Sequence, residues 1–245
     1  YAITPASQYR ENGRPVDLPD YSTTAFTDHA LRFIDQNKDR PFFLMLTYTA
    51  PHVPLQATQA QLAKVAEVKD PGMRLYRAVI NELDGGVGQI RGRLAEYGLT
   101  NDTLIVFVSD NGCPDYIREV CSNDPLNAWK RYLTEGGVRV PYMMAWPGKI
   151  RGGQTYEQAV STLDIFPTAV AAAGGTADPE RPADGGNLLP YVQGLDKGHP
   201  HERLYWRSLP SYAIRDGDWK LLVNANPKGE TVTMLFNLAD DISEK

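Results

Sequence analysis

Apolar residues recur at helical spacing in three segments, each bounded by turn or capping residues. One pattern predicts a helix from Thr23 to Asn37. A longer helix is predicted after Asp70, which can cap it, with Pro71 at its first position. Gly98 ends this pattern as a C-cap. A short third helix is predicted over Asp164–Ala173.

Three glycines interrupt the apolar face of the long helix. They are Gly85, Gly86 and Gly88, and each costs about 1 kcal/mol relative to alanine in a helix. We therefore expect these glycines to allow close approach of a neighbouring element.

Two continuous apolar runs, each following a predicted helix, have the length of buried strands. They are Phe42–Tyr48 and Thr103–Val108. A third strand-like run, Val138–Trp146, is interrupted by Pro141. A helix followed by an apolar strand, twice over, is typical of an α/β sheet with helices on its faces. The pattern predicts a mixed, mostly parallel sheet flanked by helices.

From about Glu202 the pattern changes to short strands separated by turns. The predicted strands are Leu204–Trp206, Tyr212–Arg215, Trp219–Val223 and Thr231–Phe236. Asp216-Gly217 is a strong hairpin signal. We therefore predict a partial α/β domain over residues 1–200 and a small antiparallel C-terminal subdomain over residues 201–245.

Charge, hydropathy and cysteine content limit the classes of partner and environment that the chain suits. Lysine and arginine number 25 against 30 aspartates and glutamates, for a net charge of −5 and no basic tract. A nucleic-acid partner is therefore not indicated. No apolar run approaches the roughly 18 residues that a membrane helix needs. The two cysteines, Cys113 and Cys121, either pair across one loop or are both free.

Asp110-Asn111-Gly112 directly follows the predicted strand 103–108. Ligands of open α/β sheets bind at the carboxyl ends of strands. The side-chain oxygens of Asp110 and Asn111 suit Ca²⁺ or Mg²⁺ better than zinc. The same tripeptide also fits a plain turn.

His52 and Lys130 complete a candidate site with that tripeptide. His52 lies in the loop after the other predicted strand, where a histidine can bind an anion or act as general acid or base. Lys130 precedes the third strand-like run and near a metal would clamp an anion. Each alone also fits an ordinary loop residue. Together with Asp110 and Asn111 they would stabilise charge on a transferring sulfuryl or phosphoryl group.

Other polar residues receive structural interpretations. Asp164 is expected to cap its helix, and His199-Pro200-His201 to form a surface turn. Arg139 is expected in an ion pair. Arg215 is either structural or a substrate contact from the tail sheet.

The order of the motifs resembles that of the type I sulfatases, a family of the alkaline-phosphatase-like superfamily. The resemblance covers nearly the whole chain and rests on Ala50–Pro54, Leu83–Gly88, Asp110–Gly112, Lys130–Pro141, Asp164–Thr168 and Ala213–Asp241. The block Glu135–Pro141 after a lysine, downstream of Asp-Asn-Gly, is its most specific part.

The resemblance implies a role for each candidate residue. Asp110 and Asn111 correspond to two ligands of Ca²⁺, with Mg²⁺ as the second choice. His52 corresponds to a histidine that contacts the sulfate or its leaving-group oxygen, and Lys130 to a lysine that binds a sulfate oxygen. The family's nucleophile is a formylglycine made from the cysteine or serine of a Cys/Ser-x-Pro-x-Arg motif.

That motif is missing here, because Cys113-Pro114 and Cys121-Ser122 both depart from it. No Asp-Asp pair precedes the first predicted strand either. We therefore expect the nucleophile and half of the metal site on an amino-terminal portion of a longer enzyme, with which this segment associates. We expect no turnover from this segment alone.

The implied activity is that of a sulfuric ester hydrolase, which releases inorganic sulfate from a sulfated small molecule or glycan by a metal-assisted mechanism. By family habit such an enzyme is exported, to the periplasm, the extracellular space or the lysosome. Two alternatives stay open. One is a phosphoester or phosphonate hydrolase of the same superfamily, and the other is a non-catalytic relative that binds anions or carbohydrate.

Overall fold

The computed structural model describes residues 9–17, 21–176, 178–225 and 230–245. The chain divides into two compact units, Tyr1–Thr100 and Asn101–Lys245. This division does not coincide with the predicted boundary at residue 200. The tail sheet belongs to the second unit, and its Lys220 makes a buried ion pair with Glu135 in that unit.

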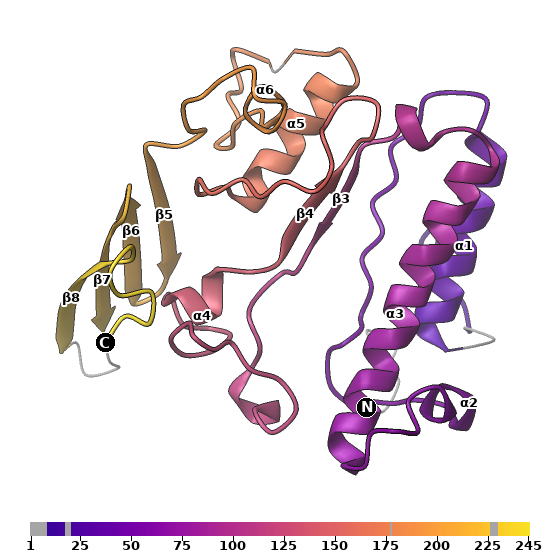
Figure 1. Ribbon diagram of the computed structural model, residues 1–245, viewed down its shortest axis with the longest axis horizontal. Helices are drawn as coiled ribbons and strands as arrows, with labels where there is room; N and C mark the ends of the chain where they lie inside the picture. The colour runs from indigo at the N-terminus through magenta and orange to yellow at the C-terminus, as the bar shows by residue number, and fades with distance from the viewer. Residues whose placement is uncertain (1–8, 18–20, 177, 226–229) are drawn as a thin grey trace. The chain divides into compact units, whose positions relative to one another are not determined.

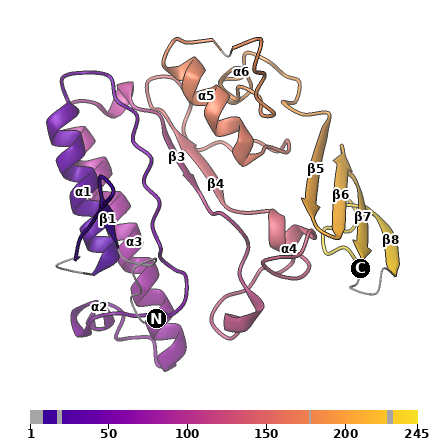
Figure 2. The same ribbon diagram turned by 180° about the vertical axis from the view of Figure 1, so that it is seen from behind.

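Two long helices, α1 and α3, dominate the first unit and lie side by side (Figures 1 and 2). The elements of this unit are β1 (Arg10–Glu11), β2 (Arg14–Pro15), α1 (Ser22–Asn37), α2 (Gln59–Ala63) and α3 (Pro71–Glu96). Both long helices were predicted, and so were the ends of α3. The Asp70 carboxylate accepts a hydrogen bond from Met73 N at 2.7 Å, and Gly98 adopts a φ of +71°.

Of the glycines Gly85, Gly86 and Gly88 in α3, only Gly86 lies at a close approach. A Cβ there would lie 2.5 Å from Thr27 Oγ1 on α1 and 2.9 Å from the Tyr48 hydroxyl. Those two hydroxyls hydrogen-bond to each other at 2.8 Å. Gly85 and Gly88 face open space, so the predicted close approach is confirmed for Gly86 and wrong for the other two.

The predicted strand Phe42–Tyr48 is wrong. The segment is extended, and exposure alternates along it from Pro41 to Ala50, but no strand in the described ranges hydrogen-bonds with it. Phe42 packs edge-on against Phe33, with ring centroids 5.8 Å apart, whereas Phe43 and Met45 are 70% and 74% exposed. A strand needs a hydrogen-bonded neighbour as well as an apolar sequence.

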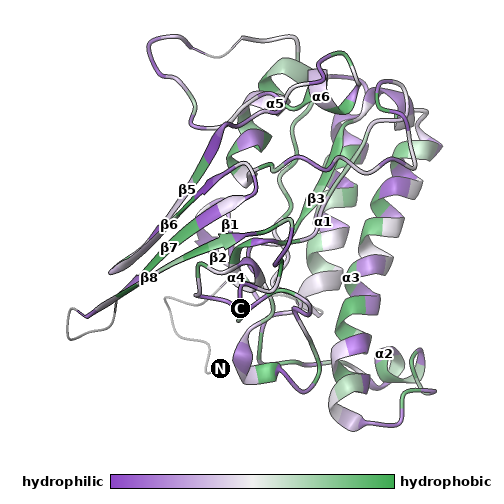
Figure 3. Ribbon diagram, turned by 60° about the vertical axis from the view of Figure 1, so that its left-hand side comes forward, coloured by the Kyte–Doolittle hydropathy of each residue, from purple (hydrophilic) through white to green (hydrophobic). Residues whose placement is uncertain are grey.

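In the second unit, β3 (Ile105–Val108) pairs with β4 (Tyr142–Ala145) in antiparallel register. Figure 3 shows the apolar residues of β3 as a continuous green stretch. All strand pairs in the described part of the chain are antiparallel, so the mostly parallel sheet is not found there. The physical reason is the connection. Ser109 N donates to Pro141 O at 3.2 Å, so the chain re-enters beside the end that it left, whereas a parallel strand requires a crossover.

The strand predicted over Val138–Trp146 begins only at Tyr142. Glu135–Val138 forms the short helix α4 instead. Pro141 has no N–H for a ladder and separates the helix from the strand.

The tail forms the predicted antiparallel sheet, in the order β5-β6-β7-β8. Its strands are β5 (Arg203–Ser208), β6 (Ser211–Asp216), β7 (Trp219–Ala225) and β8 (Thr231–Asn237). In-register residues Ala213 and Leu222 are buried on one face, whereas Tyr205 on the other is 68% exposed. The other elements of the unit are the short helices η2 (Asp115–Ile117), η3 (Thr162–Asp164), α5 (Ile165–Ala172) and α6 (Leu189–Val192), preceded by η1 (Thr100–Asp102). None of the helices among the described residues has the length and apolar character needed to cross a bilayer.

Candidate functional site

Asp110 and Asn111 lie just after β3, separated from it by Ser109, as predicted. The Ser109 hydroxyl donates to Asn111 O at 2.9 Å and folds the chain back at the strand end. Asp110 is exposed and Asn111 is half-buried. Both residues therefore lie at the carboxyl end of a strand, where a ligand can reach them.

The loop that carries these residues is in backbone contact with α4. Gly112 N donates to Gly137 O at 3.2 Å. A Cβ on Gly112 would collide with the carbonyl oxygen of Gly136, and a Cβ on Gly136 would collide with those of Asn127 and Ala128. Only glycine permits this approach, which explains the Gly-Gly pair after Glu135.

Lys130 lies beside the same loop. Its backbone N–H donates to Cys113 O at 3.0 Å, which places it next to the residue that follows Asp110-Asn111-Gly112. Lys130 is half-buried, and in the described ranges no carboxylate forms an ion pair with its ammonium group. The structure thus brings the backbone of Lys130 beside the loop that carries Asp110 and Asn111.

His52 belongs to the first unit and is exposed. Its Nδ1 lies 2.7 Å from Val53 O. A carbonyl oxygen only accepts, so Nδ1 carries the proton and Nε2 is the nitrogen left for a substrate. Neutral His52 can accept a proton there, and the protonated ring can donate one.

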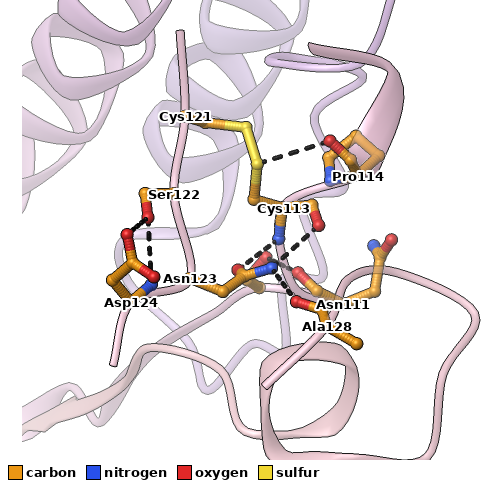
Figure 4. The surroundings of a disulfide bond; sticks show 9 residues. Asn111, Cys113, Pro114, Cys121, Ser122, Asn123, Asp124 and Ala128 are labelled. Carbon is orange, nitrogen blue, oxygen red and sulfur yellow. Dashed lines mark hydrogen bonds between the residues drawn. A yellow bond between two sulfur atoms is a disulfide. The ribbon is translucent and has the colours of Figure 1, made fainter. Parts of the chain in front are cut away.

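Asn123, which carries no obvious signal in the sequence, fixes the loop after Asp110-Asn111-Gly112 (Figure 4). Its Oδ1 accepts from Cys113 N at 2.8 Å, and its Nδ2 donates to Cys113 O and Ala128 O, both at 3.0 Å. A disulfide between Cys113 and Cys121 closes the same loop and settles the alternative that the sequence left open. The candidate metal ligands and Lys130 are therefore attached to one braced loop.

A buried ion cluster that includes Glu135, the first residue of α4, was not predicted from the sequence. Lys220 Nζ lies 2.8 Å from Glu135 Oε1 and 3.0 Å from Glu244 Oε1. Burial raises the pKa of the Glu244 carboxyl above its ordinary value, and the nearby Lys220 offsets only part of this rise. Arg139 and Arg215 approach the second Glu135 oxygen at 3.6 and 3.9 Å, so the expected ion pair of Arg139 is confirmed.

The predicted surface turn at His199-Pro200-His201 is wrong for His201. Its Nε2 lies 2.7 Å from an oxygen of fully buried Asp164, and its side chain is 11% exposed. Asp164 also accepts from Ser161 N at 2.7 Å, as the third residue of a capping box on η3, and from Gly186 N at 2.8 Å. Its side chain makes no cap hydrogen bond on α5, so the predicted cap of that helix is wrong. The histidine is held because a buried carboxylate needs a partner. It borders a hollow of about 590 Å³ whose lining includes Arg203 and Arg215.

The donor chemistry at β3 fits a hard cation in part. Asp110 and Asn111 supply two oxygen ligands, against the six to eight that Ca²⁺ takes. No cluster of three or more histidine, cysteine or acidic side chains able to hold a metal occurs among the described residues. Ca²⁺ at this position would need further ligands besides Asp110 and Asn111.

The chain is similar to several characterised proteins. It is 34% identical to human steryl-sulfatase over 76% of its own length and 32% of that protein. It is 33% identical to mouse N-acetylgalactosamine-6-sulfatase over 81% of its length and 38% of that protein. The chain thus spans about a third of the curated relatives that it matches.

Two solved structures show the same fold. The crystal structure of Ps i-CgsB in complex with k-i-k-neocarrahexaose matches with a TM-score of 0.84 and 37% identity, over 96% of this chain and 52% of that one. The phosphonate monoester hydrolase of Agrobacterium radiobacter matches with a TM-score of 0.66 at 21% identity, over 92% of this chain and 57% of that one. The expected alkaline-phosphatase-like α/β class is confirmed by these likenesses.

The family model described as Sulfatase matches residues 2–175, which include Asp110, Asn111, Lys130 and His52. With more than two thirds of the sequence inside that match, this chain belongs to the sulfatase family.

Proposed function

We propose that the protein containing this chain hydrolyses sulfate esters and releases inorganic sulfate. The observation that carries the proposal is the backbone attachment of Lys130 to the loop of Asp110 and Asn111, through Lys130 N and Cys113 O at 3.0 Å. This attachment supports the proposal because it brings the Lys130 backbone beside two side chains whose oxygens suit a cation. A lysine ammonium group together with a bound cation would stabilise a tetrahedral oxyanion.

Each residue then has a role. Asp110 and Asn111 would hold Ca²⁺, and when bound this ion supplies positive charge that stabilises the transferring sulfuryl group. The Lys130 ammonium binds a sulfate oxygen. His52 uses Nε2 at the sulfate or leaving-group oxygen, with Nδ1 fixed by Val53 O.

The nucleophile is proposed to lie outside this sequence. Both cysteines of the chain are joined in one disulfide, so neither is available as a thiol. We expect a formylglycine on an amino-terminal portion of the same enzyme, and no turnover without it.

A sulfated glycan is the substrate class that we propose. The structure that matches over 96% of this chain was solved with a neocarrahexaose, and N-acetylgalactosamine-6-sulfatase is named for a sulfated sugar. An exported location accords with the disulfide, since such bonds persist in oxidising compartments.

The test measures inorganic sulfate and phosphate released by the complete protein from 4-nitrophenyl sulfate, 4-nitrophenyl phosphate and a sulfated oligosaccharide. We expect sulfate release, reduced about 10²–10³-fold by Lys130→Met, as for the loss of one anion-stabilising group. Lys149→Met, which removes an exposed lysine, is the matched control. Release of phosphate alone would support the phosphoester alternative, and release of neither anion would refute hydrolysis.

A further inference from the structure

Three ionisable side chains are buried together where the tail sheet meets α4. The exposed fractions are 2% for Glu135, 0% for Lys220 and 3% for Glu244. Lys220 lies on β7, whereas Glu244 lies next to the last residue of the chain. A buried charge needs a partner, and here one ammonium group lies within ion-pair distance of two carboxylates. It donates a hydrogen bond to Glu135 Oε1.

Glu244 contacts the Lys130 loop on both sides of the lysine. Asn127 Nδ2 donates to the backbone oxygen of Glu244 at 3.0 Å, and Glu135 N donates to Glu244 Oε2 at 2.6 Å. Asn127 O in turn accepts from Gly136 N at 2.8 Å. The segment 127–136, with Lys130 inside it, is therefore closed by Glu244.

The backbone of Glu244 is strained to make these contacts. Its φ is +51°, in the left-handed region that a residue with a Cβ adopts at a cost. A non-glycine residue keeps such a conformation where surrounding contacts determine it. Both the side chain and the carbonyl group of Glu244 are used, which accounts for the conformation.

The same contacts reach the candidate metal ligands. Glu135 begins α4, and the next two glycines touch Gly112, which follows Asp110 and Asn111. A shift of Glu135 would thus move the Lys130 loop relative to the β3 end. Misplacement of a binding group by about 1 Å can cost up to 10²-fold in rate.

We infer that Glu244, held by Lys220, is a positioning residue that sets Lys130 against the loop of Asp110 and Asn111. The inference rests on the proposed function for Lys130. Glu244 acts through the loop and touches no substrate itself.

A double-mutant cycle in the complete protein tests the inference. Glu244→Gln keeps the shape and removes the charge, and we expect it to lower kcat/KM for a sulfate ester about 10- to 100-fold, with a raised KM. In a Lys130→Met background the same change should alter kcat/KM by less than about twofold, because the two residues act as one unit. Glu180→Gln, at an exposed carboxylate of the same unit, is the matched control.

If the double variant lost kcat/KM by the product of the two single losses, the inference would be overturned, because Glu244 would then act independently of Lys130. Should Glu244→Gln not fold, Asn127→Ala cuts the other contact of Glu244, leaves the ion cluster in place, and enters the same cycle with the same expectation.

Amide hydrogen exchange measures the local stability of residues 127–136 and does not depend on which reaction the protein catalyses. We expect Glu244→Gln to speed exchange over residues 127–136 by about tenfold or more, relative to Glu180→Gln. Unchanged exchange there overturns the inference even if the enzyme is an active sulfatase. Absence of sulfate release from the unaltered protein, with faster exchange in the variant, would instead refute the proposed function alone.

Discussion

The side-chain amide of Asn123 binds both backbone groups of Cys113, with Oδ1 2.8 Å from its nitrogen and Nδ2 3.0 Å from its oxygen. The hydrogen bonds that a neighbouring strand would supply to Cys113, two residues after Asn111, thus come from one side chain. The amide also binds Ala128 O at 3.0 Å, so it joins the two parts of the site loop.

Replacing Asn123 by alanine should lower the free energy of unfolding by about 2–3 kcal/mol, at roughly 1 kcal/mol for each of its three hydrogen bonds. The measurement is urea denaturation of the complete protein. The neighbouring Ser122→Ala, which removes an exposed hydroxyl, should change it by less than about 0.5 kcal/mol. Equal effects of the two changes would show that Asn123 does not brace the loop.

The glycines between the β3 loop and α4 allow a second prediction. Alanine at Gly112 or Gly136 places a Cβ against carbonyl oxygens of the facing backbone, so each should destabilise the protein by at least about 2 kcal/mol. Gly152→Ala is the matched control, because a Cβ there meets nothing within 4 Å and its φ is not positive. Thermal unfolding compares the three, and a harmless Gly112→Ala would contradict the described contact.

The disulfide should contribute measurable stability. It joins Cys113 and Cys121, eight residues apart, and closing a loop of that size contributes about 2–3 kcal/mol in the chain-entropy model. Reductant should therefore shift the urea midpoint of the unaltered protein downward. The shift should be smaller in the double variant Cys113→Ser/Cys121→Ser, which lacks this disulfide. An identical shift in both proteins would mean that reductant acts elsewhere.

Ca²⁺ should stabilise the complete protein through Asp110. A ligand at one hundred times its dissociation constant adds about 2.7 kcal/mol to the free energy of unfolding. We expect chelation by EGTA to lower the Tm and abolish sulfate release, and Ca²⁺ to restore both better than Mg²⁺. Asp110→Asn should weaken the Ca²⁺ response, whereas Asp102→Asn at an exposed position should not. A Tm independent of Ca²⁺ in all three proteins would argue against the metal site.

Asp35 on α1 predicts how the first unit responds to acid. Its carboxylate forms an ion pair with Arg93 and accepts from the Tyr97 hydroxyl at 3.0 Å. The pKa of Asp35 is held below its ordinary 3.8, chiefly by the hydrogen bond from Arg93. A carboxyl with a lowered pKa stabilises the folded state above that ordinary value, and the contribution is lost as pH falls through the lowered one.

Asp35→Asn should therefore reduce stability at neutral pH and flatten its loss below about pH 4. Urea midpoints between about pH 2.5 and 7 measure this, with exposed Asp28→Asn on the same helix as control. Parallel pH curves for Asp35→Asn and the unaltered protein would show that the pair contributes nothing.

Periodicity predicted the elements that depend on local sequence. The helices α1, α3 and α5 and the strands β5–β8 all lie where the apolar spacing indicated them. Pairing direction was not predictable in this way, because it depends on where the connection between strands runs. The run at 42–48 has an apolar sequence, yet its backbone has no partner in the described ranges.

The candidate site was predictable only where its residues stand in a motif. Asp110, Asn111 and Lys130 were predicted from their motifs, and the backbone of Lys130 lies beside the loop of the other two. Asn123 and Glu244 were not, because their roles arise from contacts with residues 10 and 109 positions away. No spacing rule signals such contacts, which exist only once the chain has folded.

The alternation of exposure along residues 41–50 has a consequence for tolerated changes in length. Phe42 and Tyr48 face α1 through Phe33 and Thr27, while Phe43 and Met45 face outward. In an extended chain, inserting one residue exchanges the two sides from that point on, whereas inserting two restores them. Relatives that differ in length within this segment should therefore differ by even numbers of residues. An even change keeps Phe42 and Tyr48 on the side that faces α1.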